Sequence, residues 1–205
     1  MGYIGKQPTS VPLTSSDVAD GIITSAKIAN GTIATADIAD GAVTSVKTTG
    51  VGGANTPAFE AFLSADVTLN DATNTKIQFN TEVFDSDGCY DNTTNYRFTP
   101  TTAGKYLIYT KVGFDEGPGN VEALFVDIYK NGSNLSRSFI NFDTSTADDG
   151  EGASPSQSII VDMNGSTDYV EVFVNANHIS GSNTIVAQGS TTEYNTVFGG
   201  FKLIT

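Results

Sequence analysis

Residues 79–109 read FNTEVFDSDGCYDNTTNYRFTPTTAGKYLIY. Short runs rich in Phe, Tyr, Val and Ile alternate here with clusters of Asp, Asn, Ser, Gly and Pro. Aromatic and β-branched residues favour strands, and the clusters between them favour turns. This stretch therefore predicts several short strands joined by turns.

The same pattern extends over the rest of the chain from Ala58 onward. Turn clusters separate ten segments that predict strands: AFEAFLSADV (58–67), TKIQFNTEVF (75–84), TNYRFTP (94–100), GKYLIYTKVGF (104–114), VEALFVDIYKNG (121–132), NLSRSFINF (134–142), SQSIIVDM (156–163), TDYVEVFVNA (167–176), NTIVAQG (183–189) and NTVFGGFKLI (195–204). Such regular spacing is typical of a sandwich or jelly roll. We expect an all-β fold with very little helix.

Alternation is clearest in residues 169–176, where Val170, Val172 and Val174 share one face of the predicted strand. Tyr169 and Phe173 share the opposite face. An exposed aromatic face is a liability in a monomer, so these two residues are our candidates for a subunit interface. A rim contact within one chain is the alternative.

Several residues of the opening stretch carry a family resemblance. It resembles the signature of the globular head of complement component one, subcomponent q, within the tumour-necrosis-factor-like superfamily. The matching positions are Phe79, Asp85, Tyr90, Phe98, Gly104 and Tyr106, and the match resumes at 128–132 and 198–203. The resemblance implies a ten-stranded jelly roll that assembles as a homotrimer.

Residues 16–45 contain a ten-residue repeat: SDVADGIITS, AKIANGTIAT and ADIADGAVTS. Each copy carries an Asp-Gly or Asn-Gly pair, a strong signal for a tight hairpin turn. The runs between the pairs are long enough for strands but offer few large apolar side chains. We expect a short β-rich stalk in which stacked repeats, or three chains wrapped around one axis, bury that surface. A flexible linker is the alternative.

These patterns divide the chain into three parts: residues 1–15, 16–56 and 57–205. The first contains Tyr3, Ile4, Val11 and Leu13, too few apolar residues for a core, and we interpret it as a docking peptide. A disordered terminus is the alternative. The second part is the stalk with a Gly-rich joint, and the third is the head.

A decapeptide stalk before such a head resembles the fibres, spikes and decoration proteins of tailed bacterial viruses. That resemblance implies a virion appendage, made in the host cytoplasm and displayed on the particle. Its N-terminus would bind a capsid or tail protein, and its head would attach to a host-surface glycan or protein. A soluble complement-like recognition protein or lectin is the alternative.

Charge narrows the possible partners. The formal net charge of the chain is −13. Residues 1–56 hold three lysines and four aspartates, a net of −1, so residues 57–205 carry the remaining −12. An acidic head repels phosphate backbones, so we expect no nucleic-acid binding. The sequence also predicts no signal peptide and no membrane insertion.

Enzyme and metal signatures are weak. The lone histidine, His178, has no nucleophile or metal-ligand motif near it, and we expect it to be solvated and the protein not to be an enzyme. The acidic loops Asp115–Glu116 and Asp148–Asp149 with Glu151 make calcium binding possible, although solvated loops are the simpler interpretation. The single cysteine, Cys89, excludes an internal disulfide.

Overall fold

The computed structural model describes residues 14–43, 55–116, 121–142, 152–178 and 185–203. The chain divides into two compact units, Met1–Val51 and Gly52–Thr205. The divisions expected at residues 15 and 56 stay predictions. In the described part of the chain, no helix is both long and apolar enough to cross a membrane.

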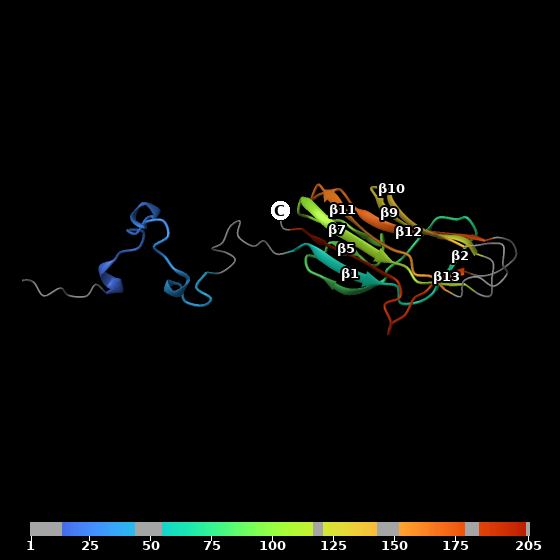
Figure 1. Cartoon of the computed structure of the whole chain (residues 1–205), viewed down its shortest axis with the longest axis horizontal. Helices are drawn as coiled ribbons and strands as arrows, with labels where there is room; N and C mark the ends of the chain where they lie inside the picture. Colours follow the sequence, from blue (N-terminus) through green and yellow to red (C-terminus); the bar gives the residue numbers. More distant parts are fainter. Residues whose placement is uncertain (1–13, 44–54, 117–120, 143–151, 179–184, 204–205) are drawn as a thin grey trace, which may run out of the picture. The chain divides into compact units, whose positions relative to one another are not determined.

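The second unit, the head, is built from strands (Figure 1). Their bounds are β1 Ala58–Phe62, β2 Val67–Leu69, β3 Thr75–Lys76, β4 Thr81–Asp85, β5 Tyr90–Asp91, β6 Arg97–Phe98, β7 Gly104–Lys111, β8 Phe114–Glu116, β9 Val121–Lys130, β10 Ser133–Asn141, β11 Ser156–Met163, β12 Val170–His178, β13 Ile185–Ala187 and β14 Val197–Lys202. The expected all-β class is confirmed.

Two main sheets form the body of the head. One has the strand order β11-β7-β14-β1-β4, and the other has the order β10-β9-β12-β6-β5 with β3 paired to β12. A third, small sheet, β2-β13-β8, lies toward one end of the head (Figure 1). The pairings are antiparallel, and the chain passes repeatedly from one main sheet to the other, as it does in a jelly roll.

Aromatic side chains fill the space between the two main sheets. The Phe59 ring stacks on those of Tyr90 and Phe98, with centroid distances of 4.8 and 4.4 Å. It also meets Phe198 edge-on at 4.9 Å. Offset and edge-on arrangements are the favourable ones for aromatic pairs. The aromatic positions of the opening stretch therefore build the core of the head.

The alternation predicted for β12 is confirmed on its inner side. Val170, Val172 and Val174 are fully buried in the core. Phe173 pairs with Asp127 across the β9–β12 ladder, on the opposite face of that sheet. Tyr169 precedes the strand.

The stalk repeat does not form the expected strands. Among residues 14–43 each copy instead begins with one turn of 3₁₀-helix: η1 Ser15–Asp17, η2 Ser25–Lys27 and η3 Thr35–Asp37. In the first copy, local side-chain bonds support this turn, because the Asp17 carboxylate accepts hydrogen bonds from both the backbone N–H and the hydroxyl of Thr14.

The hairpin geometry expected for the Asp-Gly and Asn-Gly pairs is wrong as well. A hairpin turn of that type needs positive φ at both central residues. In residues 14–43 positive φ occurs at Gly21, Gly31 and Gly41, with values of 79°, 79° and 76°, and not at the preceding Asp or Asn. Positive φ at the third residue alone makes each pair a type II turn. Such a turn redirects the chain without pairing two strands.

Candidate functional site

The outer face of the sheet β11-β7-β14-β1-β4 is the candidate contact surface of the head. Along β7, Tyr106 and Ile108 are fully buried in the core, so Leu107 and Tyr109 point away from it. On the neighbouring strand β11, Ile160 points the same way and is 57% exposed. One side of the sheet therefore faces the core, and the other presents apolar side chains outward.

An apolar row crosses four strands of this face. The register pairs Ile160 with Leu107, Leu107 with Phe201, and Phe201 with Ala58. These four residues are the apolar row of the outer face. Contiguous exposed apolar surface of this kind marks contact sites in soluble proteins.

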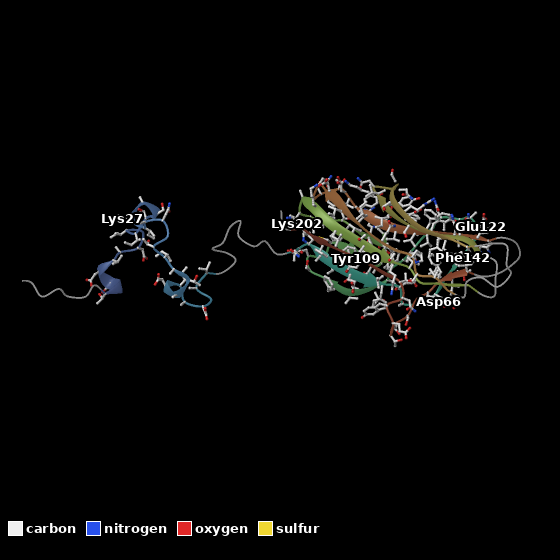
Figure 2. The ribbon with its side chains drawn as sticks, in the orientation of Figure 1. Lys27, Asp66, Tyr109, Glu122, Phe142 and Lys202 are labelled. Atoms are coloured by element: carbon white, nitrogen blue, oxygen red, sulfur yellow. The ribbon has the colours of Figure 1, made fainter. Side chains whose placement is uncertain are left out.

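A polar pair lies beside the apolar row. The Tyr109 hydroxyl, on β7 (Figure 2), donates a 2.7 Å hydrogen bond to the Glu60 carboxylate on β1. The tyrosine ring reaches Glu60 across Gly199 of β14, where an added Cβ would lie 2.3 Å from the hydroxyl oxygen. The glycine is thus required for this bond to form.

Electrostatics keep the Tyr109 hydroxyl in its donor form. Burial is the main cause that raises the pKa of Tyr109 well above its usual 10.0, and the hydrogen bond to Glu60 adds to the shift. A phenol with a raised pKa remains protonated through the neutral range. It therefore acts as a fixed hydrogen-bond donor and not as a base.

A shallow hollow of about 400 Å³ adjoins the pair. Its lining residues come from β7, β11 and β14: Tyr109, Thr110, Lys111, Ser156, Gln157, Ser158 and Val197. Beyond it, Phe62 stacks on Tyr194 with a centroid distance of 4.6 Å. The outer face thus combines apolar surface, a hollow and a few polar groups, as protein contact surfaces do.

The predicted interface residues Tyr169 and Phe173 lie elsewhere and have partners within the chain. The Arg97 guanidinium lies over the Tyr169 ring, 4.2 Å from its centroid. Phe173 packs against Tyr129 of β9 at a centroid distance of 4.4 Å. Their role in a subunit interface stays a prediction.

Sequence reasoning missed Leu107, Tyr109 and Ile160. The signal was present, because GKYLIYTK and SQSIIVDM carry large apolar residues at consecutive positions, which face opposite sides of a strand. Apolar residues on both faces of a strand indicate that the strand is buried on both faces. We interpreted both segments as strands without drawing that consequence.

Other candidates from the sequence differ in outcome. His178 is half-buried, and its Nε2 atom is buried and has no hydrogen-bond partner among the described residues, so the expectation of a solvated side chain is wrong for that atom. Asp115 is exposed on β8, whereas Asp148, Asp149 and Glu151 lie outside the described residues, as do Tyr3, Ile4, Val11 and Leu13. Across the described ranges, no group of three or more His, Cys, Asp or Glu could hold a metal ion.

The strand orders of the two main sheets decide the fold of the head. Two antiparallel five-strand paths lie face to face around one aromatic core. This is the jelly roll that the sequence predicted.

Comparisons with known proteins give a likeness in fold. The chain is similar to the globular domain of zebrafish complement 1qA, with 15% identity, a TM-score of 0.46, and coverage of 72% of this chain and 97% of that one. It is also similar to murine APRIL, with 13% identity, a TM-score of 0.48, and coverage of 71% and 98%. Eiger TNF from S. frugiperda is similar at 8% identity and a TM-score of 0.46, with coverage of 71% and 91%. No protein-family model and no curated protein matches the sequence.

Proposed function

We propose that the chain is a non-enzymatic, homotrimeric virion appendage of the fibre, spike or decoration type. Residues 1–15 anchor it to a capsid or tail protein, residues 16–56 form the stalk, and the head attaches to a glycan or protein of the host surface. The observation that carries the proposal is the outer face of the sheet β11-β7-β14-β1-β4, on which Ile160 and Phe84 are exposed.

Association of three chains covers apolar side chains that this face exposes to water in a single chain. Ile160 is 57% exposed in a single chain, and Phe84 of β4 is 46% exposed on the same sheet. Covering such side chains stabilises an assembly by roughly 25 cal/mol per Å² of apolar area removed from water. The resemblance carried by residues 79–109 implies three copies, and we take that number.

Attachment through three equal heads suits a weak individual contact. Linked binding sites raise the overall affinity by effective concentration, without any new contact at one site. We place host contact on the loops of the head, since recognition residues usually lie on loops held by a rigid scaffold.

Solution mass tests the trimer directly. We expect three copies for the full chain, measured by light scattering, and a shift towards monomer for Ile160→Asp, because a carboxylate would be buried without a partner. Ser133→Asp is the matched control, since it adds the same charge at an exposed position of β10 in the other sheet. A monomeric wild-type chain, or an Ile160→Asp variant as trimeric as the wild type, would overturn the assembly.

Anchoring needs its own test on particles. Replacing Tyr3, Ile4, Val11 and Leu13 together by Ser should remove the chain from purified virus particles, as measured by immunoblot with an antibody against the head. The mass of the free chain should not change. Equal incorporation of the variant and the wild type would argue against N-terminal anchoring, and absence of the wild-type chain from particles would reject the virion role.

A further inference from the structure

Three charged side chains of the stalk repeat bond to the backbone of their own chain. The carboxylates of Asp17 and Asp37 accept hydrogen bonds from the backbone N–H groups of Thr14 and Ala34. The Lys27 ammonium donates to the backbone carbonyl of Ile22 at 2.7 Å. These charged groups, at equivalent positions of the three copies, are thus turned back onto their own chain and are not directed at a partner.

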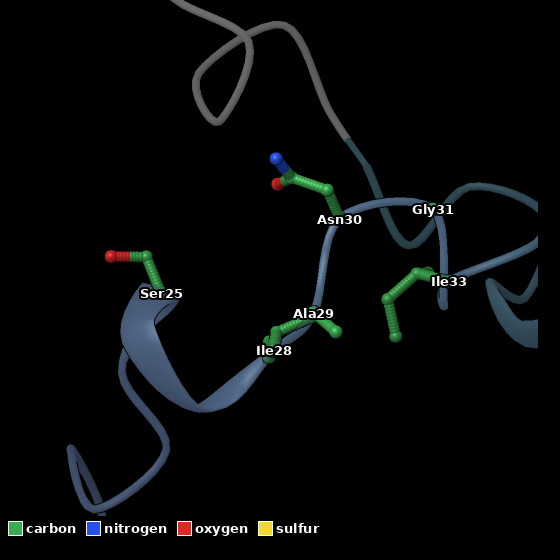
Figure 3. A pocket seen from close by; sticks show the side chains of 6 residues that line it. All are labelled: Ser25, Ile28, Ala29, Asn30, Gly31 and Ile33. Carbon is green, nitrogen blue, oxygen red and sulfur yellow. The ribbon is translucent and has the colours of Figure 1, made fainter.

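The apolar side chains of the repeat are exposed. Seven branched side chains of the repeat are between 38% and 56% exposed: Val18, Ile22, Ile23, Ile28, Ile33, Ile38 and Val43. Figure 3 shows the middle copy, in which Ile28, Ala29 and Ile33 line an open hollow of about 290 Å³ beside the Asn30–Gly31 turn. The repeat therefore holds its own backbone in shape but lacks cover for its apolar side chains.

The three decapeptides of the repeat have closely similar geometry. In each copy the 3₁₀ turn closes with an N–H to carbonyl distance of 2.9–3.0 Å, and the second turn places glycine at a φ between 76° and 79°. Similar units therefore recur every ten residues, each presenting branched residues at the same positions. A partner segment that covers all three decapeptides needs apolar side chains at the same ten-residue spacing. The same segment of another chain has that spacing.

We infer that residues 14–43 of the three chains in the proposed trimer pack side by side, parallel and in register. The branched residues of each decapeptide form one apolar layer of a shared stalk core. This inference rests on the homotrimer of the proposed function, because the head sets both the number of chains and their common direction.

The area involved explains why the head is needed. Full burial of a branched side chain removes roughly 60–120 Å² from water, so seven half-exposed ones offer on the order of 300 Å² per copy. A stable interface buries about 800 Å² on each partner. The stalk alone falls short of that, and association of the heads supplies the high effective concentration that it requires.

Disulfide trapping in the full chain tests the inference. In a Cys89→Ser background, Ile23→Cys and Ile33→Cys should form interchain disulfides on mild oxidation, because a disulfide requires the two Cα atoms to lie within about 7 Å. Each chain carries one cysteine, so linked dimers should contain at most two of every three chains. Tenfold dilution should leave the yield unchanged.

Matched controls are Asp20→Cys and Asp40→Cys, which lie at exposed positions of the glycine turns in the first and third decapeptides. They should link at least tenfold more slowly. A chain that is trimeric by mass but links Asp40→Cys as fast as Ile33→Cys would overturn the shared stalk core and leave the proposed function intact. A monomeric chain would overturn both.

Discussion

At the scale of single residues, Gly199 controls the polar pair of the outer face. Its missing side chain leaves room for the Tyr109 ring, whose hydroxyl bonds to Glu60. An added Cβ would lie 2.4 Å from the ring carbon that carries the hydroxyl, far inside a normal contact. A side chain at this position must displace the ring.

We predict that Gly199→Ala weakens the proposed trimer about tenfold or more. The physical reason is displacement of the Tyr109 ring, which changes the shape of the outer face where the copies meet; a tenfold loss corresponds to about 1.4 kcal/mol of association free energy. The measurement is sedimentation equilibrium. In a Tyr109→Ala background the same substitution should cost much less, because no ring remains to be displaced. An equal cost in both backgrounds would contradict this account.

Individual residues also show what the sequence could predict. Phe79, Phe98 and Tyr106 are positions of the family resemblance, and all three are fully buried in the core. Asp85 belongs to the same motif, and its carboxylate accepts the backbone N–H of Tyr90 at 2.8 Å. Motif positions that support the fold were therefore predictable. Gly199 was not, because its role depends on a strand more than 80 residues earlier in the chain.

At the scale of elements, β9 and β10 are joined by an ion pair between the buried Asp127 and the partly exposed Arg137. The Arg137 guanidinium donates two hydrogen bonds of 2.7 Å to the carboxylate of Asp127, which is fully buried. The Arg137 guanidinium also lies 4.8 Å from the centroid of the Phe125 ring. Removing one partner of such a pair leaves an uncompensated charge in the protein.

We predict that Arg137→Ala lowers the free energy of unfolding by about 3–5 kcal/mol, measured by urea denaturation. The double variant Arg137→Ala/Asp127→Ala should be less destabilised than the single one, because the unpaired carboxylate is gone. Lys105→Ala is the matched control. It breaks the exposed pair with Asp162, and should cost no more than about 1 kcal/mol. Similar losses for the two single variants would refute the distinction.

Elements also mark where sequence reasoning failed. The strands of the head were predictable because turn clusters bound them and core residues alternate along them. The repeat was not, because Asp-Gly and Asn-Gly pairs are compatible with several turn types, and the sequence does not state which φ values their first residues take. Each 3₁₀ turn is closed by a backbone hydrogen bond, and in the first copy bonds between Thr14 and Asp17 support it.

At the scale of the whole molecule, net charge opposes assembly. Each chain carries −13, so three copies repel one another over distances set by ionic strength. The Debye length falls from about 30 Å at 0.01 M salt to about 8 Å at 0.15 M. Apolar contact across the outer face must overcome that repulsion.

We predict that the proposed trimer is tighter in 150 mM than in 10 mM sodium chloride, because screening reduces like-charge repulsion while leaving apolar burial in place. Sedimentation equilibrium at both concentrations measures the difference. Tighter association at the lower salt concentration would mean that opposite charges, and not apolar surface, hold the copies together.

The self-contained decapeptide has a consequence for how such a molecule can change over generations. Each turn hydrogen bond joins residues only three positions apart, as from Lys27 to Thr24 and from Thr32 to Ala29. A duplication or loss of ten residues therefore leaves every neighbouring unit with its bonding unchanged. The length of the stalk can therefore change over generations in steps of ten residues, while the jelly roll at its end stays as it is.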